Sequence, residues 1–123
     1  MTVAVVDDDH RVLESMQDLL EAFGYRALLY ATAEEFLESP ERDSVDCLIS
    51  DIGLPGMSGL DLMRVMRGES RSLPTILITA RTEAHLEREA AELEPLRYFL
   101  KPFDAAQLLA TLEALQTARR SHC

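Results

Sequence analysis

Five polar side chains follow apolar runs at separate points of the chain, and their types suit phosphoryl-transfer chemistry: Asp7, Asp8, Asp51, Thr79 and Lys101. Three carboxylates packed together repel one another, and a raised pKa or a bound cation relieves that repulsion. Ligands that are all oxygen favour a hard ion, and Mg²⁺ accepts a site with few protein ligands and several waters. We therefore predict Mg²⁺ as the cofactor wherever these acids meet.

Asp51 is the residue best placed to react with a phosphoryl group. It ends an apolar run and is followed at once by a loop rich in Gly and Pro, which places a carboxylate at the C-terminal mouth of a strand. A carboxylate attacks phosphorus when the charges of both groups are neutralised. Mg²⁺ and Lys101 would neutralise them, and Thr79 would donate a hydrogen bond to a phosphoryl oxygen.

Taken singly, these residues have simpler explanations. Asp9, beside the first two acids, has the position of a helix N-cap. Thr79 alone is an ordinary strand-end residue, and Lys101 alone is an ordinary solvated lysine. The set is more specific than its members, because parallel strands bring their C-terminal ends to one edge of a sheet.

The segments that must position these side chains alternate between strand and helix patterns. Short β-branched or apolar runs predict strands over 2–6, 27–30, 45–51, 75–80 and 97–100. Helical spacing, with Thr32, Ser58 and Asp104 as N-caps, predicts a helix after each strand. The alternation predicts an α/β fold, a doubly wound parallel sheet of five strands with five helices on both faces.

The helix predicted over 81–93 has few apolar residues among many charges, so we expect it to be the least firmly packed. Glu94 and Pro95 follow it. The proline lacks a backbone donor and biases Glu94 away from helical geometry, so the helix is expected to end early or shift.

Composition narrows the class of protein. The chain has 123 residues, enough for one domain, and its net charge of −10 would repel a phosphate backbone, so we expect no direct nucleic-acid binding. Cys47 and Cys123 form neither a disulfide framework nor a metal cluster, and Cys47 is expected to be a buried hydrophobe. The apolar runs are too short for a membrane span, so we expect a cytoplasmic protein that does not bind membranes.

Four short motifs resemble those of bacterial two-component response-regulator receiver domains. They are VVDDD at 5–9, DIGLPGMSG at 51–59, ITA at 78–80 and KPF at 101–103. The similarity extends from Val3 to about Leu115, and its style is closest to receivers of helix-turn-helix transcription regulators. The resemblance implies a flavodoxin-like sheet with strand order 2-1-3-4-5.

The resemblance also implies roles for individual residues. Asp51 would be the phosphoacceptor, taking a phosphoryl group from the phosphohistidine of a histidine kinase or phosphotransfer protein. Asp8 and Asp51 would bind Mg²⁺ directly, Asp7 would act largely through water, and the main-chain carbonyl of Gly53 would complete the protein ligands.

Thr79 and Tyr98 match the switch pair of the family, in which the hydroxyl turns toward the phosphoryl group and the ring follows it inward. On its own, Tyr98 would be a half-buried strand aromatic. The response would alter the surface built from the fourth helix, the fifth strand and the last helix. Arg81, two residues past Thr79, would either contact or shield the phosphoryl group or remain a solvated arginine.

We expect a receiver domain over residues 1–118 and a tail or the start of a linker over 119–123. The implied partners besides the kinase are a C-terminal DNA-binding output domain outside this chain and a second copy in a phosphorylation-dependent homodimer. The sequence leaves open whether the receiver stands alone or belongs to a longer regulator.

Two other functions compete with the switch. Aspartate-nucleophile phosphohydrolases carry a second Asp two residues after the nucleophile as general acid, and here that position is Gly53. We therefore predict no enzyme beyond catalysis of its own phosphorylation and dephosphorylation. The alternative is a receiver-like interaction module that works without phosphorylation.

Overall fold

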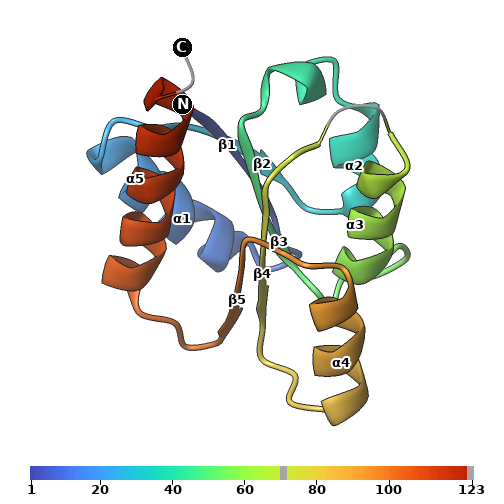
Figure 1. Cartoon of the computed structure of the whole chain (residues 1–123). Coiled ribbons are helices and arrows are strands. Elements are labelled where there is room, and N and C mark those ends of the chain that lie inside the picture. The colour runs from blue at the N-terminus through green and yellow to red at the C-terminus, as the bar shows by residue number, and fades with distance from the viewer. Residues whose placement is uncertain (70–71, 122–123) are drawn as a thin grey trace.

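The five apolar segments form one parallel sheet in the computed structural model of the protein, which describes residues 1–69 and 72–121. The strand order is β2-β1-β3-β4-β5, as the resemblance implied (Figure 1). The strands are β1 (Thr2–Val6), β2 (Arg26–Tyr30), β3 (Cys47–Asp51), β4 (Thr75–Thr79) and β5 (Arg97–Leu100). Strand β3 begins two residues later than predicted, because a short 3₁₀ turn, η1 (Arg42–Ser44), leads into it.

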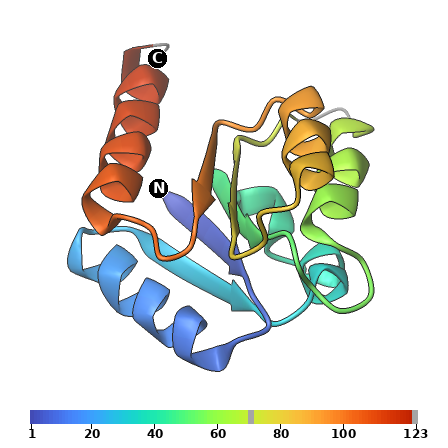
Figure 2. The ribbon, with the colours of Figure 1, turned by 90° about the horizontal axis from the view of Figure 1, so that it is seen from below.

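Helices cover both faces of the sheet. They are α1 (His10–Ala22), α2 (Ala33–Glu38), α3 (Gly59–Arg67), α4 (Ala84–Glu92) and α5 (Ala105–Ser121). Helices α1 and α5 lie on one face, and α2, α3 and α4 lie on the other (Figures 1 and 2). The predicted doubly wound α/β architecture is confirmed.

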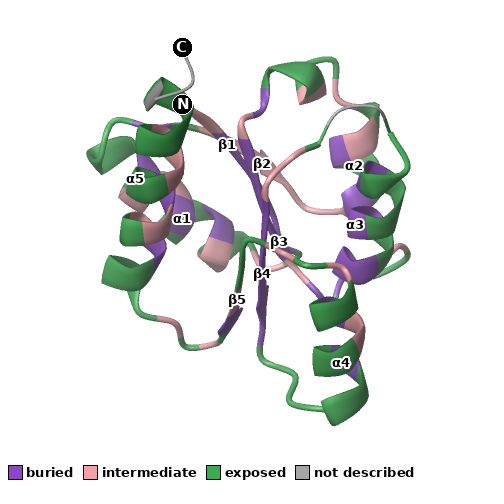
Figure 3. Ribbon diagram, in the orientation of Figure 1, coloured by how far each residue is buried: buried purple, intermediate pink, exposed green. Residues whose placement is uncertain are grey.

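Alternation along the strands divides the core between the two faces. Val3 and Val5 pack with α1 and α5, whereas Ala4 and Val6 pack with α2 and α3. Figure 3 shows β1, β3 and β4 as almost wholly buried, which explains why their sequences are continuous apolar runs. The buried strands hold the side chains at their C-terminal ends in fixed positions.

Side-chain caps begin the helices where the sequence predicted them. Asp9 accepts from the backbone N–H of Arg11, and Thr32 accepts from that of Glu35. Ser58 likewise caps α3 through the N–H of Asp61. Each such cap stabilises its helix by about 1 kcal/mol. The caps confirm the interpretation of Asp9 as an N-cap residue.

Helix α4 is shorter than predicted at both ends. Residues 81–83 are not helical, because the backbone N–H of Arg81 donates to Thr79 Oγ1 and Glu83 is the extended N-cap residue. At the other end Glu94 adopts a φ of 51°, so the chain leaves the helix before Pro95, as predicted. The helix buries only Leu86 and Ala90, which confirms its light packing.

Helix α5 continues through Ser121, past the predicted domain boundary at 118. Its last turn is fixed by Arg119, which pairs over 2.6 Å with Asp46, the residue just before β3. The boundary itself stays a prediction, and His122 and Cys123 lie outside the described residues. Within 1–69 and 72–121, no helix is long and apolar enough to cross a membrane.

Candidate functional site

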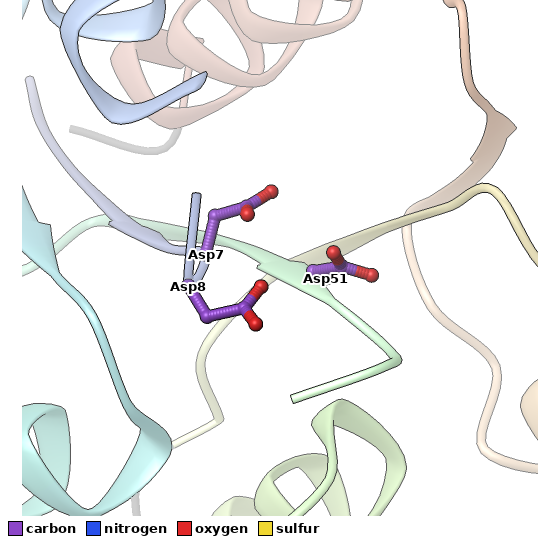
Figure 4. Close-up of side chains that lie close together, drawn as sticks. All are labelled: Asp7, Asp8 and Asp51. Carbon is purple, nitrogen blue, oxygen red and sulfur yellow. The ribbon is translucent and has the colours of Figure 1, made fainter. Parts of the chain in front are cut away.

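The C-terminal ends of β1 and β3 bring three carboxylates together. Asp7 and Asp8 follow β1, and Asp51 is the last residue of the adjacent strand β3. One oxygen from each of the three lies within 4.8 Å of the others. Figure 4 shows all three side chains gathered at this edge of the sheet. The structure thus places together the acids that the sequence predicted to meet.

The three carboxylates differ in burial and in their hydrogen bonds. Asp7 is only 4% exposed, and its Oδ1 accepts from the N–H of Asp9 over 2.9 Å. The side chain of Asp51 is 12% exposed, and its Oδ1 accepts from the N–H of Gly53 over 3.0 Å. Asp8 is exposed. These bonds hold the Oδ1 atoms of Asp7 and Asp51, and the Oδ2 atom of each carboxylate remains available to another partner.

Lys101, which follows β5, bridges the two free oxygens. Its Nζ donates to Asp7 Oδ2 over 2.9 Å and to Asp51 Oδ2 over 3.0 Å. Burial alone lowers the pKa of Lys101, but these hydrogen bonds outweigh it, and the pKa lies above its usual 10.5. Lys101 is also the only lysine in the sequence. The ammonium is therefore a fixed positive charge between the two acids.

Burial disfavours the charged form of the Asp7 carboxyl. Burial raises its pKa above the usual 3.8, although the Asp9 N–H and Lys101 both act to lower it. Three oxygen donors and a single ammonium leave the site with excess negative charge. A hard divalent cation would relieve this excess, so the donor set fits Mg²⁺.

We expect Asp7→Asn to stabilise the metal-free protein at neutral pH. A raised pKa means that protonation of Asp7 favours the folded state, a contribution that is complete below pH 3.8 and lost as the pH rises through the raised value. Asparagine carries no charge at any pH, so the variant avoids the cost of burying the charged carboxylate at neutral pH. We expect this to raise the free energy of unfolding by roughly 0.5–2 kcal/mol. Thermal unfolding in chelator at several pH values measures the difference.

In the same experiment, added Mg²⁺ should stabilise the wild type more than the variant, because only the wild type keeps all three acids. The variant and the wild type should converge in stability toward pH 3.8, where Asp7 is largely protonated. A variant that is less stable than the wild type in chelator at neutral pH would contradict the inference that burial of the charged Asp7 carboxylate destabilises the fold.

Thr79 and Tyr98 lie on neighbouring strands. Thr79 is fully buried at the end of β4, and its hydroxyl oxygen accepts from the N–H of Arg81 over 3.0 Å. Tyr98 is half-buried and packs against a core cluster that includes Leu86 and Ala90 of α4. Burial raises the pKa of Tyr98, and the carboxylates of Glu87 in α4 and of its N-cap residue Glu83 add to the rise. The ring therefore lies between β5 and the lightly packed helix.

Arg81 and Gly53 lie beside one another at the rim of the site. The guanidinium of Arg81 pairs with Glu83 over 3.0 Å, and the side chain of Arg81 is 53% exposed. Its Cδ lies 3.5 Å from the position that a Cβ would take at Gly53. The aliphatic part of Arg81 thus covers Gly53, while its charge is directed to Glu83.

Cys47, by contrast, has no place in this site. It is fully buried in β3, and burial raises the pKa of its thiol to about 12. A thiol with such a pKa is unreactive at neutral pH, which confirms that Cys47 serves as a small core residue.

A sequence model of the response regulator receiver domain matches residues 3–113. The chain belongs to this family. It is a receiver domain of two-component response regulators, as the four motifs implied.

Curated relatives of this receiver domain include transcription regulators. It is 30% identical to the transcriptional regulatory protein FixJ of Bradyrhizobium diazoefficiens over 91% of this chain and 55% of that protein. It is 34% identical to the response regulator MprA of Mycobacterium leprae over 94% of this chain and 50% of that protein. The receiver domain thus spans about half the length of the relatives it matches.

Solved receiver structures share the fold. The N-terminal fragment FixJ-N matches with a TM-score of 0.80 and 28% identity, covering 93% of this chain and 91% of that one. The receiver domain of an HD domain-containing protein from Pseudomonas fluorescens matches with a TM-score of 0.88 and 29% identity, covering 98% and 97%. A receiver of this shape thus also occurs in an HD domain-containing protein.

Proposed function

We propose that this receiver domain is a phosphorylation-driven switch and that Asp51 is its phosphoacceptor. The observation that carries the proposal is the setting of the Asp51 carboxylate, with one oxygen held by the N–H of Gly53 and the other by Lys101. One oxygen each of Asp7 and Asp8 lies within 4.8 Å of an Asp51 oxygen. A carboxylate held in this way can act as a nucleophile toward phosphorus.

In the proposed reaction, an oxygen of Asp51 attacks the phosphorus of a phosphohistidine. The new O–P bond forms as the P–N bond breaks, and the imidazole nitrogen keeps the electron pair. Lys101 would release one carboxylate hydrogen bond and turn its Nζ toward a phosphoryl oxygen. Mg²⁺, held by Asp8, Asp51 and the Gly53 carbonyl and through water by Asp7, would neutralise charge on the transferring group.

We propose that Thr79 and Tyr98 couple phosphorylation of Asp51 to a change in the surface formed by α4, β5 and α5. The Thr79 hydroxyl would leave the Arg81 N–H and donate to a phosphoryl oxygen. Tyr98 packs against the core cluster to which Leu86 and Ala90, the buried residues of α4, belong. The light packing of α4 supports this proposal, because a weakly held element is shifted by a small change in free energy.

The phosphohistidine donor requires a surface next to Asp51. A hollow of about 640 Å³ runs along α1 to the segment after Lys101 and is lined by Val12, Met16, Leu19 and Phe103. Asp9, next to the acid pair, also lines this hollow. We propose that a helix of the histidine kinase or phosphotransfer protein packs its apolar face here.

We also propose that the full-length regulator carries a DNA-binding output segment and acts in the cytoplasm. The support is that relatives of about twice the length of this chain are transcription regulators. A phosphorylation-dependent homodimer through the α4, β5 and α5 surface would couple the switch to such a segment.

The first test is phosphorylation by a small acyl phosphate. We expect the wild type to gain one phosphoryl group in Mg²⁺, measured by intact-protein mass spectrometry, and to gain none in excess chelator, because the acids at the site then repel the incoming anion.

Calcium in place of Mg²⁺ serves as the matched control for divalent charge, since its larger size and looser coordination suit the site less well. Equal incorporation with and without Mg²⁺ contradicts the proposed metal role. A protein that binds Mg²⁺ but takes no phosphate from any donor would favour the interaction module.

A further inference from the structure

The loop after β3, residues 53–58, is fixed at both of its ends. We call it the acceptor loop. At its start, the N–H of Gly53 donates to Asp51 Oδ1, and at its end the N–H of Gly59 donates to the carbonyl of Ile52. A Cβ at Gly59 would collide with the Asp51 carbonyl oxygen, so the loop closes tightly on the strand. The middle of the loop needs a separate support.

Glu34, the second residue of α2, supplies that support. Its Oε2 accepts from the N–H of Met57 over 3.2 Å. Gly56 has a φ of 71°, and a Cβ there would lie 2.6 Å from the same oxygen. Glycine at position 56 therefore serves both the left-handed backbone and the close approach of the carboxylate.

The helix that carries Glu34 is itself well fixed. Thr32 caps it through the N–H of Glu35, and the Glu35 carboxylate accepts from the N–H of Ala31. Ala33 and Phe36 are fully buried, and they share a core cluster with Leu54 and Met57 of the acceptor loop. Apolar packing and the Glu34 hydrogen bond thus join α2 to the loop.

We infer that Glu34 is a positioning residue, which holds the acceptor loop so that the Gly53 carbonyl is placed before a cation arrives. The inference rests on the proposed function, in which that carbonyl is a Mg²⁺ ligand. A ligand held in advance loses little conformational freedom on binding. Partners that orient metal ligands affect metal affinity although they do not touch the ion.

The test compares Glu34→Ala and Glu34→Gln in the full chain. Loss of the hydrogen bond in Glu34→Ala should speed hydrogen exchange at the Met57 amide and weaken Mg²⁺ binding about threefold to tenfold. Its phosphorylation rate at saturating Mg²⁺ should stay within about twofold of wild type, because the reacting groups are unchanged. Glu34→Gln keeps an acceptor oxygen and should restore both properties.

Glu38→Gln, which removes a charge from the exposed last turn of the same helix, is the matched control and should leave Mg²⁺ affinity unchanged. Unaltered Mg²⁺ affinity in Glu34→Ala would overturn the inference, as would a Glu34→Gln variant as weak as Glu34→Ala. A wild type that neither binds Mg²⁺ nor takes phosphate would instead contradict the proposed function.

Discussion

Asp51→Asn should gain no phosphoryl group under conditions in which the wild type gains one. The amide lacks the anionic oxygen that attacks phosphorus, so the proposed reaction has no nucleophile. The fold should survive, because the amide oxygen can still accept from the N–H of Gly53. Intact-protein mass spectrometry after incubation with Mg²⁺ and an acyl phosphate measures the result, and circular dichroism checks the fold.

Asp18→Asn is the matched control, because Asp18 is an exposed aspartate of α1 and its replacement removes the same charge. It should gain phosphate like the wild type. Phosphate on Asp51→Asn in similar yield would contradict the assignment of Asp51. Peptide mapping would then show whether Asp7 or Asp8 takes its place.

The elements that position the site could be predicted because their signals are local. Strands β1, β3 and β4 are buried on both faces, so each is a largely apolar run, and a polar residue either ends the strand or follows it directly. The N-caps Thr32 and Ser58 depend on the next few residues only. The strand order, which depends on contacts between distant segments, came from the resemblance.

Contacts between distant segments are also what sequence reasoning missed. Glu34 lies in the first turn of α2, where the helix dipole favours an acidic residue, so its type has a local explanation. Its carboxylate nevertheless accepts from the N–H of Met57, 23 residues away. The start of α4 was placed too early for a different, local reason: the N–H of Arg81 donates to the side chain of Thr79, two residues earlier, and residues 81–83 are not helical despite their helical spacing. The pattern around Glu34 could not show its contact with Met57, because that contact depends on the folded chain.

Lys101 shows how the site combines binding with chemistry. It joins Asp7 and Asp51, its partners 94 and 50 residues away, through the two oxygens that a metal ion would also approach. A Mg²⁺ ion bound by these acids would therefore compete with Lys101 for the same negative charge before phosphorylation. After phosphoryl transfer they would share a larger charge, because the phosphoryl group adds oxygens for both.

We therefore expect Lys101→Met to separate metal binding from phosphorylation. Without the competing ammonium, Mg²⁺ should bind at least as tightly as in the wild type. Phosphorylation by an acyl phosphate should slow by about 100-fold, the usual effect of removing one fixed donor to a developing charge. Calorimetric titration with Mg²⁺ and a phosphorylation time course at saturating Mg²⁺ measure the two effects.

Arg120→Met removes an exposed cation from the end of α5 and should change neither quantity. Because Lys101 is the only lysine, ¹³C labelling of lysine gives a single signal that reports its state directly. In the wild type that signal should titrate above pH 10.5 and shift toward lower pH in Mg²⁺, as the carboxylates turn to the ion. If Lys101→Met weakens Mg²⁺ binding and phosphorylation equally, the lysine supports the acids rather than competing for them, and the proposed role fails.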